Sequence, residues 1–185
     1  MEPDSVEFIF NVVGRQLPKA GVEFLMIGGH AVNHYGYSRA TIDVDFMIAA
    51  NDASVVRSVM KEAGFTNISE SENVVFFHHP EVPFRVDFLQ IDSDSMQKLM
   101  AGAQKIEYGG QPLRVPRLLD LIAMKLFALK CGSARREEKD FPDIVNLALE
   151  HGLDVEVDLK PLCDRFADER IYTKLVERIR GADHD

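Results

Sequence analysis

Hydrophobic positions along the first half of the chain switch between a helical and a strand-like period. Apolar residues three or four apart predict an amphipathic helix over 4–17, which Pro18 and Gly21 end, and a second helix from Asn51 or Asp52 to Ala63. Short apolar runs bounded by turn residues predict strands between and after these helices. The strands are expected at 22–27, 42–49, around 65–69, 74–78 and 84–90.

The second half of the chain has mostly helical periods. A short helix over 93–102 precedes a predicted hairpin at 105–108 and 112–115. Beyond Pro116 the helical pattern continues almost to the end of the chain. These helices are expected over 116–128, 137–151, 160–167 and 168–179.

Together these elements predict an α/β protein, with an α+β mixed sheet in residues 1–115 and a helical subdomain in residues 116–185. The length of 185 residues and the 46% hydrophobic content fit one domain, or two subdomains that share a core. A ligand cleft is expected between the two halves.

The sequence also carries signals of location. No segment is apolar over the length of a membrane span, and the acidic start Met1-Glu2-Pro3-Asp4 is unlike a signal peptide. Cys131 and Cys163 are not part of a Cys-x-x-Cys pair, which favours free thiols in a reducing compartment. We therefore expect a cytoplasmic protein without a membrane partner.

The formal net charge of −9 argues against broad binding of nucleic-acid duplexes. Between Arg114 and Lys139, however, seven basic residues stand against three acidic ones. This local basic patch fits a nucleoside triphosphate and could extend to a nucleic-acid end. The alternative for Arg135 and Arg136 is a solvated corner between helices.

Two aspartates interrupt the apolar run at 42–49. Asp43 and Asp45 are two positions apart, so on a strand their side chains point to the same face. Two carboxylates on one face of a mostly buried strand repel each other and are costly to desolvate. A divalent cation offsets that cost most simply, because Mg²⁺ binds one or two carboxylates together with substrate phosphates. The alternative is a pair of solvated aspartates at a strand end.

A glycine pair precedes these acids. Gly28-Gly29 follows the strand at 22–27 and opens a short helix at 30–35. Backbone N–H groups at such a turn can hold phosphate oxygens, although an ordinary tight turn is the alternative. A phosphate cradle beside a carboxylate pair indicates transfer of a nucleotidyl or phosphoryl group.

A third acid, Asp87, lies in the apolar strand at 84–90. If this strand lies beside the one that carries Asp43 and Asp45, three carboxylates converge, which is enough to hold one or two Mg²⁺ ions. The alternative is that Asp87 pairs with Arg85, which lies on the same face two positions earlier.

His30 and His34 are four positions apart on the short helix, a spacing that also suits zinc. No glutamate follows as in His-Glu-x-x-His, and no third soft ligand is near in the sequence. We therefore expect ordinary histidines on a helix surface.

Residues 27–46 resemble the signature of the nucleotidyltransferase superfamily, which has the DNA polymerase β-like fold. That signature is Gly-Gly or Gly-Ser, a gap, Asp-x-Asp, and a third carboxylate on a later strand. Arg39-Ala40-Thr41-Ile42-Asp43-Val44-Asp45 is similar to the R-x-T-x-D-x-D run of the AbiEii-like nucleotidyltransferases, which include toxins of type IV toxin–antitoxin systems. Residues 124–128 and 139–143 resemble the helical lysine and the later K/R-D-x-x-D run of that branch. The likeness covers residues 20–150, and Pro142 departs from it.

The resemblance implies a role for each matched residue. Asp43, Asp45 and Asp87 would bind Mg²⁺ or Mn²⁺ and carry catalysis. Lys125 would contact the triphosphate and act in catalysis by neutralising the charge that develops on the leaving pyrophosphate. From the residues alone, it either extends its amine to the rim of a buried helix or meets a buried anion. The implied nucleotide-binding residues are Gly28, Gly29, Arg39, Thr41, Lys125, Asp140 and Asp143. Without the resemblance, Arg39 is a loop residue and Thr41 begins a strand.

We therefore predict a Mg²⁺-dependent nucleotidyltransferase that moves a nucleoside monophosphate from a triphosphate such as ATP to an acceptor. In the toxin-like branch the acceptor would be a tRNA end or a protein, and an antitoxin would be a partner. The first alternative is a small-molecule acceptor, as in aminoglycoside nucleotidyltransferases. The second is a nucleotide-binding or interaction module without catalysis, which the presence of all three acids disfavours.

Overall fold

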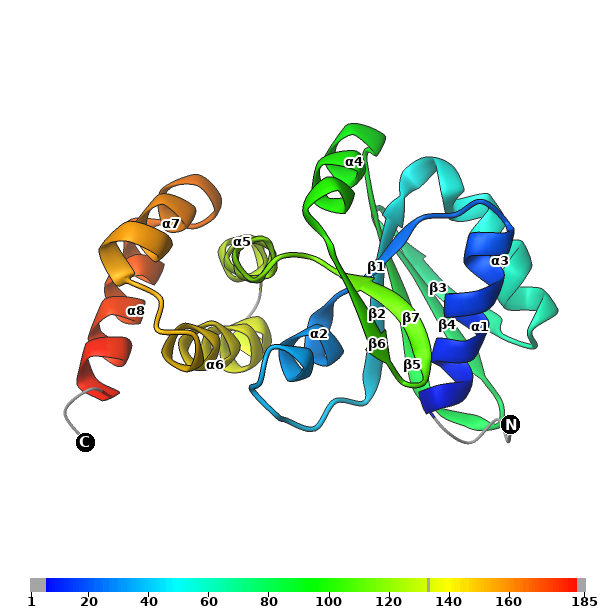
Figure 1. Cartoon of the computed structure of the whole chain (residues 1–185), viewed down its shortest axis with the longest axis horizontal. Coiled ribbons are helices and arrows are strands. Elements are labelled where there is room, and N and C mark those ends of the chain that lie inside the picture. Colours follow the sequence, from blue (N-terminus) through cyan, green and yellow to red (C-terminus); the bar gives the residue numbers. More distant parts are fainter. Residues whose placement is uncertain (1–5, 133, 183–185) are drawn as a thin grey trace. The chain divides into compact units, whose positions relative to one another are not determined.

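The structure, a computed structural model, describes residues 6–132 and 134–182, and its mixed α/β architecture confirms the predicted fold class (Figure 1). The chain forms two compact units. Unit 1 comprises Met1–Ala31 and Arg39–Arg117, and unit 2 comprises Val32–Ser38 and Leu118–Asp185. Residues 32–38 thus belong with the C-terminal helices, which a division of the chain at residue 116 does not anticipate.

Unit 1 is built on a five-stranded sheet with the strand order β1-β2-β5-β4-β3. The strands are β1 (Phe24–Met26), β2 (Asp43–Ala49), β3 (Thr66–Ser71), β4 (Val74–His79) and β5 (Val82–Ile91). β2 and β5 run parallel, and the other neighbours run antiparallel. The strands lie where the apolar runs predict them. β1 is shorter than predicted, because the N–H of Val22 donates to the carbonyl of Leu17 in the preceding helix.

One face of this sheet packs against the first helix. The helices of unit 1 are α1 (Val6–Lys19), α2 (Gly28–His34, which ends in unit 2), η1 (Ala50–Asp52), α3 (Ala53–Glu62) and α4 (Ser93–Gly102). The ring of Phe10 in α1 meets that of Phe46 in β2 edge to face, with centroids 6.3 Å apart. Because side chains alternate along β2, Phe46 and the two aspartates lie on opposite faces. α1 therefore covers the face that does not carry Asp43 and Asp45.

The end of the first helix differs from the prediction. Pro18 lies inside α1 and does not end it. A proline removes only its own N–H, and the N–H of Ala20 still donates to the carbonyl of Gln16, so the helix keeps its last turn. The predicted hairpin is present as β6 (Gln104–Tyr108) and β7 (Gln111–Val115).

The face of the sheet that carries the acids is only partly covered at β4. Along this strand Val75, Phe77 and His79 are buried, whereas Val74 and Phe76 are half-buried and His78 is exposed. This alternation is typical of a strand with one face in the core and one face toward solvent. The half-buried set shares its face with Asp87, because Phe76 is the register partner of Asp87.

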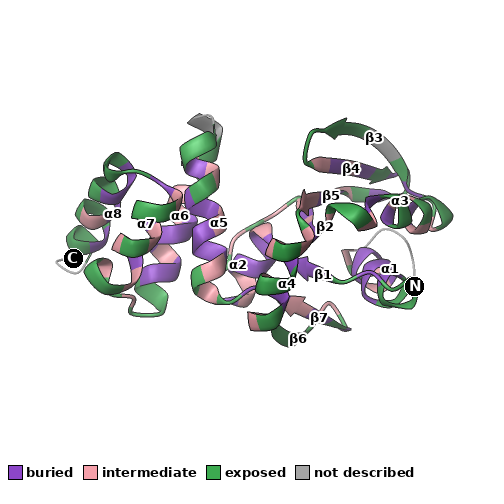
Figure 2. Ribbon diagram, turned by 90° about the horizontal axis from the view of Figure 1, so that it is seen from above, coloured by how far each residue is buried: buried purple, intermediate pink, exposed green. Residues whose placement is uncertain are grey.

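Unit 2 is helical. Its elements are α5 (Leu118–Cys131), α6 (Ala134–Glu150), the π-helix η2 (Val155–Leu159), α7 (Lys160–Phe166) and α8 (Glu169–Ala182). α5 is the most buried of them, as its apolar sequence predicts (Figure 2). The sequence pattern does not predict η2, which Asp154 caps by accepting hydrogen bonds from the N–H groups of Glu156 and Val157.

Two further expectations concern cysteines and membranes. Cys131 is exposed, Cys163 is buried, and both are free thiols as predicted. None of the helices in residues 6–132 and 134–182 combines the length and the hydrophobicity that crossing a bilayer requires.

Candidate active site

The three predicted acids lie on two adjacent strands of unit 1. β2 and β5 pair in parallel with Asp45 opposite Asp87 and with Asp43 opposite Arg85. Residues two apart on a strand share a face, and so do direct register partners. The expectation that Asp87 lies on the strand next to the Asp-x-Asp pair is therefore confirmed, and all three carboxylates point to one face of the sheet.

Arg85 lies among these acids. Its Nε and one terminal nitrogen donate to the two carboxylate oxygens of Asp87 at 2.7 and 2.8 Å, a bidentate geometry. The same terminal nitrogen is 3.4 Å from Oδ2 of Asp43. The pairing of Asp87 with Arg85 was the alternative to a metal site, and the structure contains both the pair and the convergence of the acids.

The surroundings of Asp87 perturb its pKa. Burial raises the pKa of its carboxyl to about 6, and the charges of Asp45 and Asp43 add to this rise, while the hydrogen bonds from Arg85 oppose it. The negative charge gathered here therefore exceeds what one guanidinium neutralises. This is the electrostatic setting in which a further cation is stabilised.

The raised pKa of Asp87 predicts how stability depends on pH. The folded pKa of about 6 lies above the ordinary value of 3.8, so folding takes up a proton between these two pH values. The contribution of Asp87 to the free energy of unfolding is therefore largest below pH 4 and falls as the pH rises to about 6. We expect Asp87→Asn to gain stability relative to the wild type over this interval, by up to about 3 kcal/mol. Urea unfolding of both proteins between pH 4 and pH 8, without divalent metal, measures this; a constant difference would contradict it.

The glycine turn touches the Asp-x-Asp strand. Gly28 has a φ of +63°, and a Cβ added to it would lie 2.0 Å from Oδ2 of Asp45. A Cβ on Gly29 would lie 2.7 Å from the hydroxyl of Thr41 and 3.2 Å from a guanidinium nitrogen of Arg39. The predicted residues of the glycine turn and of the loop before β2 are thus brought together in unit 1.

These contacts also tie the turn to the strand. The N–H of Ile27 donates to the carbonyl of Asp45 at 2.9 Å, and the Thr41 hydroxyl donates to the carbonyl of Asp43 at 3.1 Å. Because a Cβ at residue 28 would lie 2.0 Å from Oδ2 of Asp45, the position of this carboxylate also depends on the absence of a side chain at Gly28.

Gly28→Ala is expected to impair the site more than it impairs the fold. The new methyl group must displace the Asp45 carboxylate, and a misplacement of this size reduces catalysis by about 100-fold. Gly110→Ala is the matched control, because Gly110 also has a positive φ (+69°) but no atom within 4 Å of the added Cβ. Both variants carry the backbone strain of about 1 kcal/mol, which thermal unfolding measures. Equal activity in the two variants would contradict the contact.

The donor set of this face fits a divalent metal ion. Three carboxylates supply the hard oxygen ligands that such ions take. In their present positions, however, no three acidic, histidine or cysteine side chains in the described part of the chain are arranged to hold a metal ion. The cation that contacts Asp43 and Asp87 is the guanidinium of Arg85. Two carboxylates with substrate phosphates are enough for Mg²⁺, and Arg85 must leave Asp87 before all three acids can close on an ion.

Lys125 lies in unit 2 among buried anions. Its Nζ donates to Asp140 at 2.9 Å and to Asp143 at 2.7 Å, and all three side chains are at most 6% exposed. Arg136 is 3.5 Å from the second oxygen of Asp140, beyond the length of a hydrogen bond to it. Both aspartates of the later run thus face Lys125, although Pro142 lies between them. Contact of Lys125 with a triphosphate stays a prediction, and it requires Nζ to give up at least one of these bonds.

The histidines differ from the expectation in one respect. His30 is buried rather than on a helix surface, and its Nδ1 lies 3.1 Å from the Tyr108 hydroxyl. Burial, and secondarily the charge of Arg39, lowers its pKa to about 4, so it is neutral at physiological pH. The apolar neighbours of His30 on the short helix, Ala31 and Val32, were the signal that this helix packs inward.

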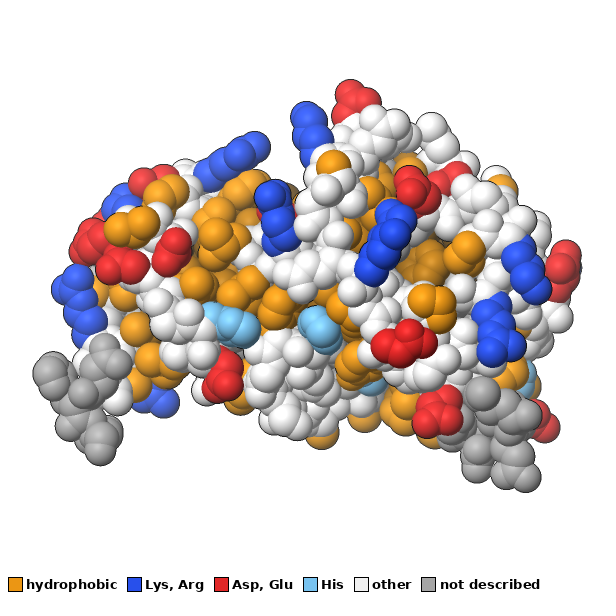
Figure 3. Space-filling view, in the orientation of Figure 1, with side chains coloured by type: hydrophobic (Ala, Val, Ile, Leu, Met, Phe, Trp, Pro, Cys, Tyr) orange, Lys and Arg blue, Asp and Glu red, His pale blue; other side chains and the backbone are white. Residues whose placement is uncertain are grey.

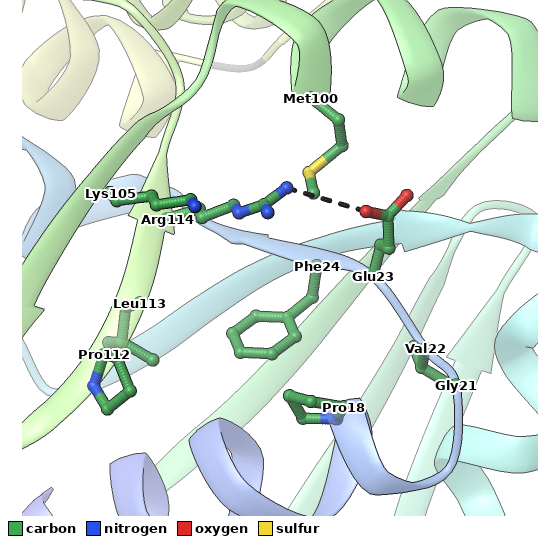
Figure 4. A pocket seen from close by; sticks show the side chains of 10 residues that line it. All are labelled: Pro18, Gly21, Val22, Glu23, Phe24, Met100, Lys105, Pro112, Leu113 and Arg114. Carbon is green, nitrogen blue, oxygen red and sulfur yellow. Dashed lines mark ion pairs between the residues drawn. The ribbon is translucent and has the colours of Figure 1, made fainter.

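A cavity of about 500 Å³ lies at the other end of β1 from the acids (Figure 4). Phe24 in its floor pairs with Ile48, at the end of β2 away from Asp43. Arg114, a member of the predicted basic patch, points into it and is 3.5 Å from the carboxylate of Glu23. Two cations of that patch, Arg114 and Lys125, therefore already have acidic partners.

Surface charge is mixed elsewhere as well. Figure 3 shows basic and acidic side chains interspersed over the face that it presents. Such a distribution differs from the continuous basic stripe that is typical of duplex-binding proteins.

The chain matches one family profile and a set of solved structures. The profile of a family described as "Nucleotidyl transferase of unknown function (DUF2204)" matches residues 7–180. No curated protein matches the chain in sequence. Among solved structures, the chain is similar to ANT(2'')-Ia in complex with adenylyl-2''-tobramycin, with a TM-score of 0.63 and 10% identity over 93% of this chain and 97% of that one.

Two other solved structures share the fold. The lincosamide antibiotic adenylyltransferase LnuA, lincomycin-bound, gives a TM-score of 0.56 and 15% identity over 78% of this chain and 97% of that one. An antigenic nucleotidyltransferase-like protein from Paracoccidioides brasiliensis gives 0.60 and 15% identity over 100% and 91%. Identities this low establish a common fold and no more.

Proposed function

The chain belongs to this family of nucleotidyl transferases, and we propose that it is a Mg²⁺-dependent enzyme that moves a nucleoside monophosphate from a triphosphate to an acceptor hydroxyl. The observation that carries the proposal is the register of β2 and β5, which sets Asp43, Asp45 and Asp87 on one face. Carboxylates gathered in this way beside a glycine turn suit a reaction that needs positioning and charge neutralisation more than covalent chemistry.

The proposed reaction forms one bond and breaks one. The acceptor oxygen bonds to the α-phosphorus, the bond from this phosphorus to the bridging oxygen breaks, and pyrophosphate leaves with the electron pair. Asp43 and Asp45 would hold the Mg²⁺ or Mn²⁺ ion, which would neutralise charge on the reacting phosphate. Asp87 would accept the hydroxyl proton, or it would complete the ligand set while the proton passes to solvent.

The other proposed contacts are with the nucleotide. The N–H groups of Gly28 and Gly29 would hold phosphate oxygens, and Arg39 and Thr41, which lie against Gly29, would order that loop or contact phosphate. For Lys125, Asp140 and Asp143 the proposed nucleotide role rests on the resemblance alone, because in unit 2 Lys125 donates hydrogen bonds to both aspartates.

Two acceptor classes follow from the two likenesses. The R-x-T-x-D-x-D run of the AbiEii-like branch favours a tRNA end or a protein, with an antitoxin as partner. The fold shared with ANT(2'')-Ia and LnuA favours a small hydroxylated molecule.

Labelled triphosphates test the proposed reaction. Each of the four triphosphates, labelled at the α- or at the γ-phosphate, is incubated with the protein, Mg²⁺ and fractions of a bacterial extract. Transfer of the α label with release of pyrophosphate is expected. Transfer of the γ label instead would identify a kinase, and retention of both labels in the triphosphate for every fraction would contradict the proposal.

A further inference from the structure

A row of side chains crosses the sheet on the face that carries the acids. It begins at the glycine turn after β1, where Gly28 abuts Asp45, and continues through Asp45 of β2 to Asp87 of β5. The next position in register, on β4, is Phe76. The row therefore runs from a predicted phosphate cradle, through the acids, to an aromatic ring.

The ring of Phe76 lies directly beside the acids. The guanidinium carbon of Arg85 is 5.1 Å from the ring centroid, within the range of a cation–π contact, while the same group holds Asp87 in a bidentate pair. Phe76 is half-buried, and its partner on β3, Ser69, is exposed. An aromatic side chain is thus left partly open to solvent next to Asp87, on a strand whose other face is buried.

The direction of the reaction places the acceptor on this side. This placement of the acceptor rests on the proposed function. In an in-line displacement the attacking and the leaving oxygens lie on opposite sides of the phosphorus. If pyrophosphate leaves toward Gly28 and Gly29, the acceptor oxygen arrives from the opposite side of Asp45, which is the side of Asp87 and Phe76.

The charge of this side decides between acceptor classes. On the face that carries the acids, the charged side chains of β3, β4 and β5 are Arg85 and Asp87. Glu70 is the register partner of Val75 and so lies on the opposite face, and Glu72 and Glu81 lie in the turns between the strands. Arg85 is already paired with Asp87. A tRNA end would need several free cations to neutralise its phosphates, so these strands are unfavourable for it. An uncharged or cationic acceptor meets no such penalty.

We propose that the open face of β4 beside Asp87 is the acceptor subsite, and that the acceptor is a small, uncharged or cationic molecule that packs the apolar face of a ring on Phe76 and presents its hydroxyl to Asp87. The bonds made and broken are those of the transfer step described above. Phe76 contacts the acceptor ring and takes no part in the proton transfer, so it sets affinity for the acceptor and not the chemical step.

The test uses α-labelled triphosphate, Mg²⁺ and five separate acceptor preparations: tobramycin, lincomycin, the low-molecular-mass fraction of a bacterial extract, the protein fraction of that extract, and total tRNA. Phe76→Ala is compared with Phe76→Tyr, which keeps the ring. Phe84→Leu is the control, because Phe84 lies on β5 with its side chain on the face opposite to Asp87. Thermal unfolding confirms that each variant is folded.

The expected result is label in a small-molecule product. Phe76→Ala raises the KM for that acceptor about 10- to 100-fold with kcat nearly unchanged, whereas Phe76→Tyr and Phe84→Leu behave as the wild type. Label in tRNA or protein would overturn the subsite and leave the proposed function standing. An unchanged KM in Phe76→Ala, or a loss confined to kcat, would also overturn it. If the wild type transfers no label to any preparation, the proposed function itself has failed.

Discussion

Asp45→Asn is expected to abolish nucleotidyl transfer while leaving the protein folded. The substitution keeps the size of the side chain and removes the charge that would hold the metal ion, so we expect a loss on the order of a thousandfold or more in kcat. Stability should be retained or increased, because the charge of Asp45 contributes to the raised pKa of Asp87 and is unfavourable in the folded protein. Release of labelled pyrophosphate and urea unfolding measure the two effects.

Asp52→Asn provides the matched control for this experiment. Asp52 lies in the same unit, in the short helix η1 directly after β2, and its side chain makes no capping hydrogen bond. The Asp52→Asn variant should transfer nucleotide at the wild-type rate. If Asp45→Asn is as active as Asp52→Asn, the carboxylates on β2 do not hold the reacting centre.

Lys125→Met is expected to have the largest effect on stability. It leaves the carboxylates of Asp140 and Asp143 buried without their common partner. Removing one member of a buried ion pair destabilises a protein by about 3–5 kcal/mol. The free energy of unfolding from urea titration measures this, and the exposed Lys130 of the same helix supplies the control Lys130→Met, expected within about 0.5 kcal/mol of the wild type.

The same pair of variants separates two roles of Lys125. A structural lysine gives a large loss of stability, and its activity falls in proportion to the unfolded fraction. A lysine that binds the triphosphate gives a raised KM for the triphosphate in the folded protein. If Lys125→Met is as stable and as active as Lys130→Met, the buried cluster has neither role.

Much of the fold was predictable because hydrophobic periodicity and turn residues agreed with each other. The apolar runs at 42–49 and 74–78, both bounded by turn residues, became strands in the sheet. The paired acids of the site followed from the same alternation, since residues 43 and 45 must share a face. The sequence does not determine which strands are neighbours in the sheet, and the pairing of β2 with β5 is shown only by the structure.

What the sequence did not reveal depends on contacts between distant residues. His30 was predicted on a helix surface, and its burial results from packing against Phe10 and Tyr108, which are far from it in the chain. The bidentate grip of Arg85 on Asp87 was one of two open alternatives, because side-chain rotamers are not encoded in spacing. The position of Phe76 beside Asp87 likewise follows from the register of β4 and β5 and not from spacing in the sequence.

A crystal structure with Mn²⁺ and a non-hydrolysable triphosphate tests the central claim most directly. The anomalous signal of manganese is expected between the carboxylates of Asp43 and Asp45, with Arg85 withdrawn from Asp87 and the triphosphate extending toward Gly28. A manganese site elsewhere in the chain, with the pair between Arg85 and Asp87 intact and no phosphate near Gly28, would contradict it.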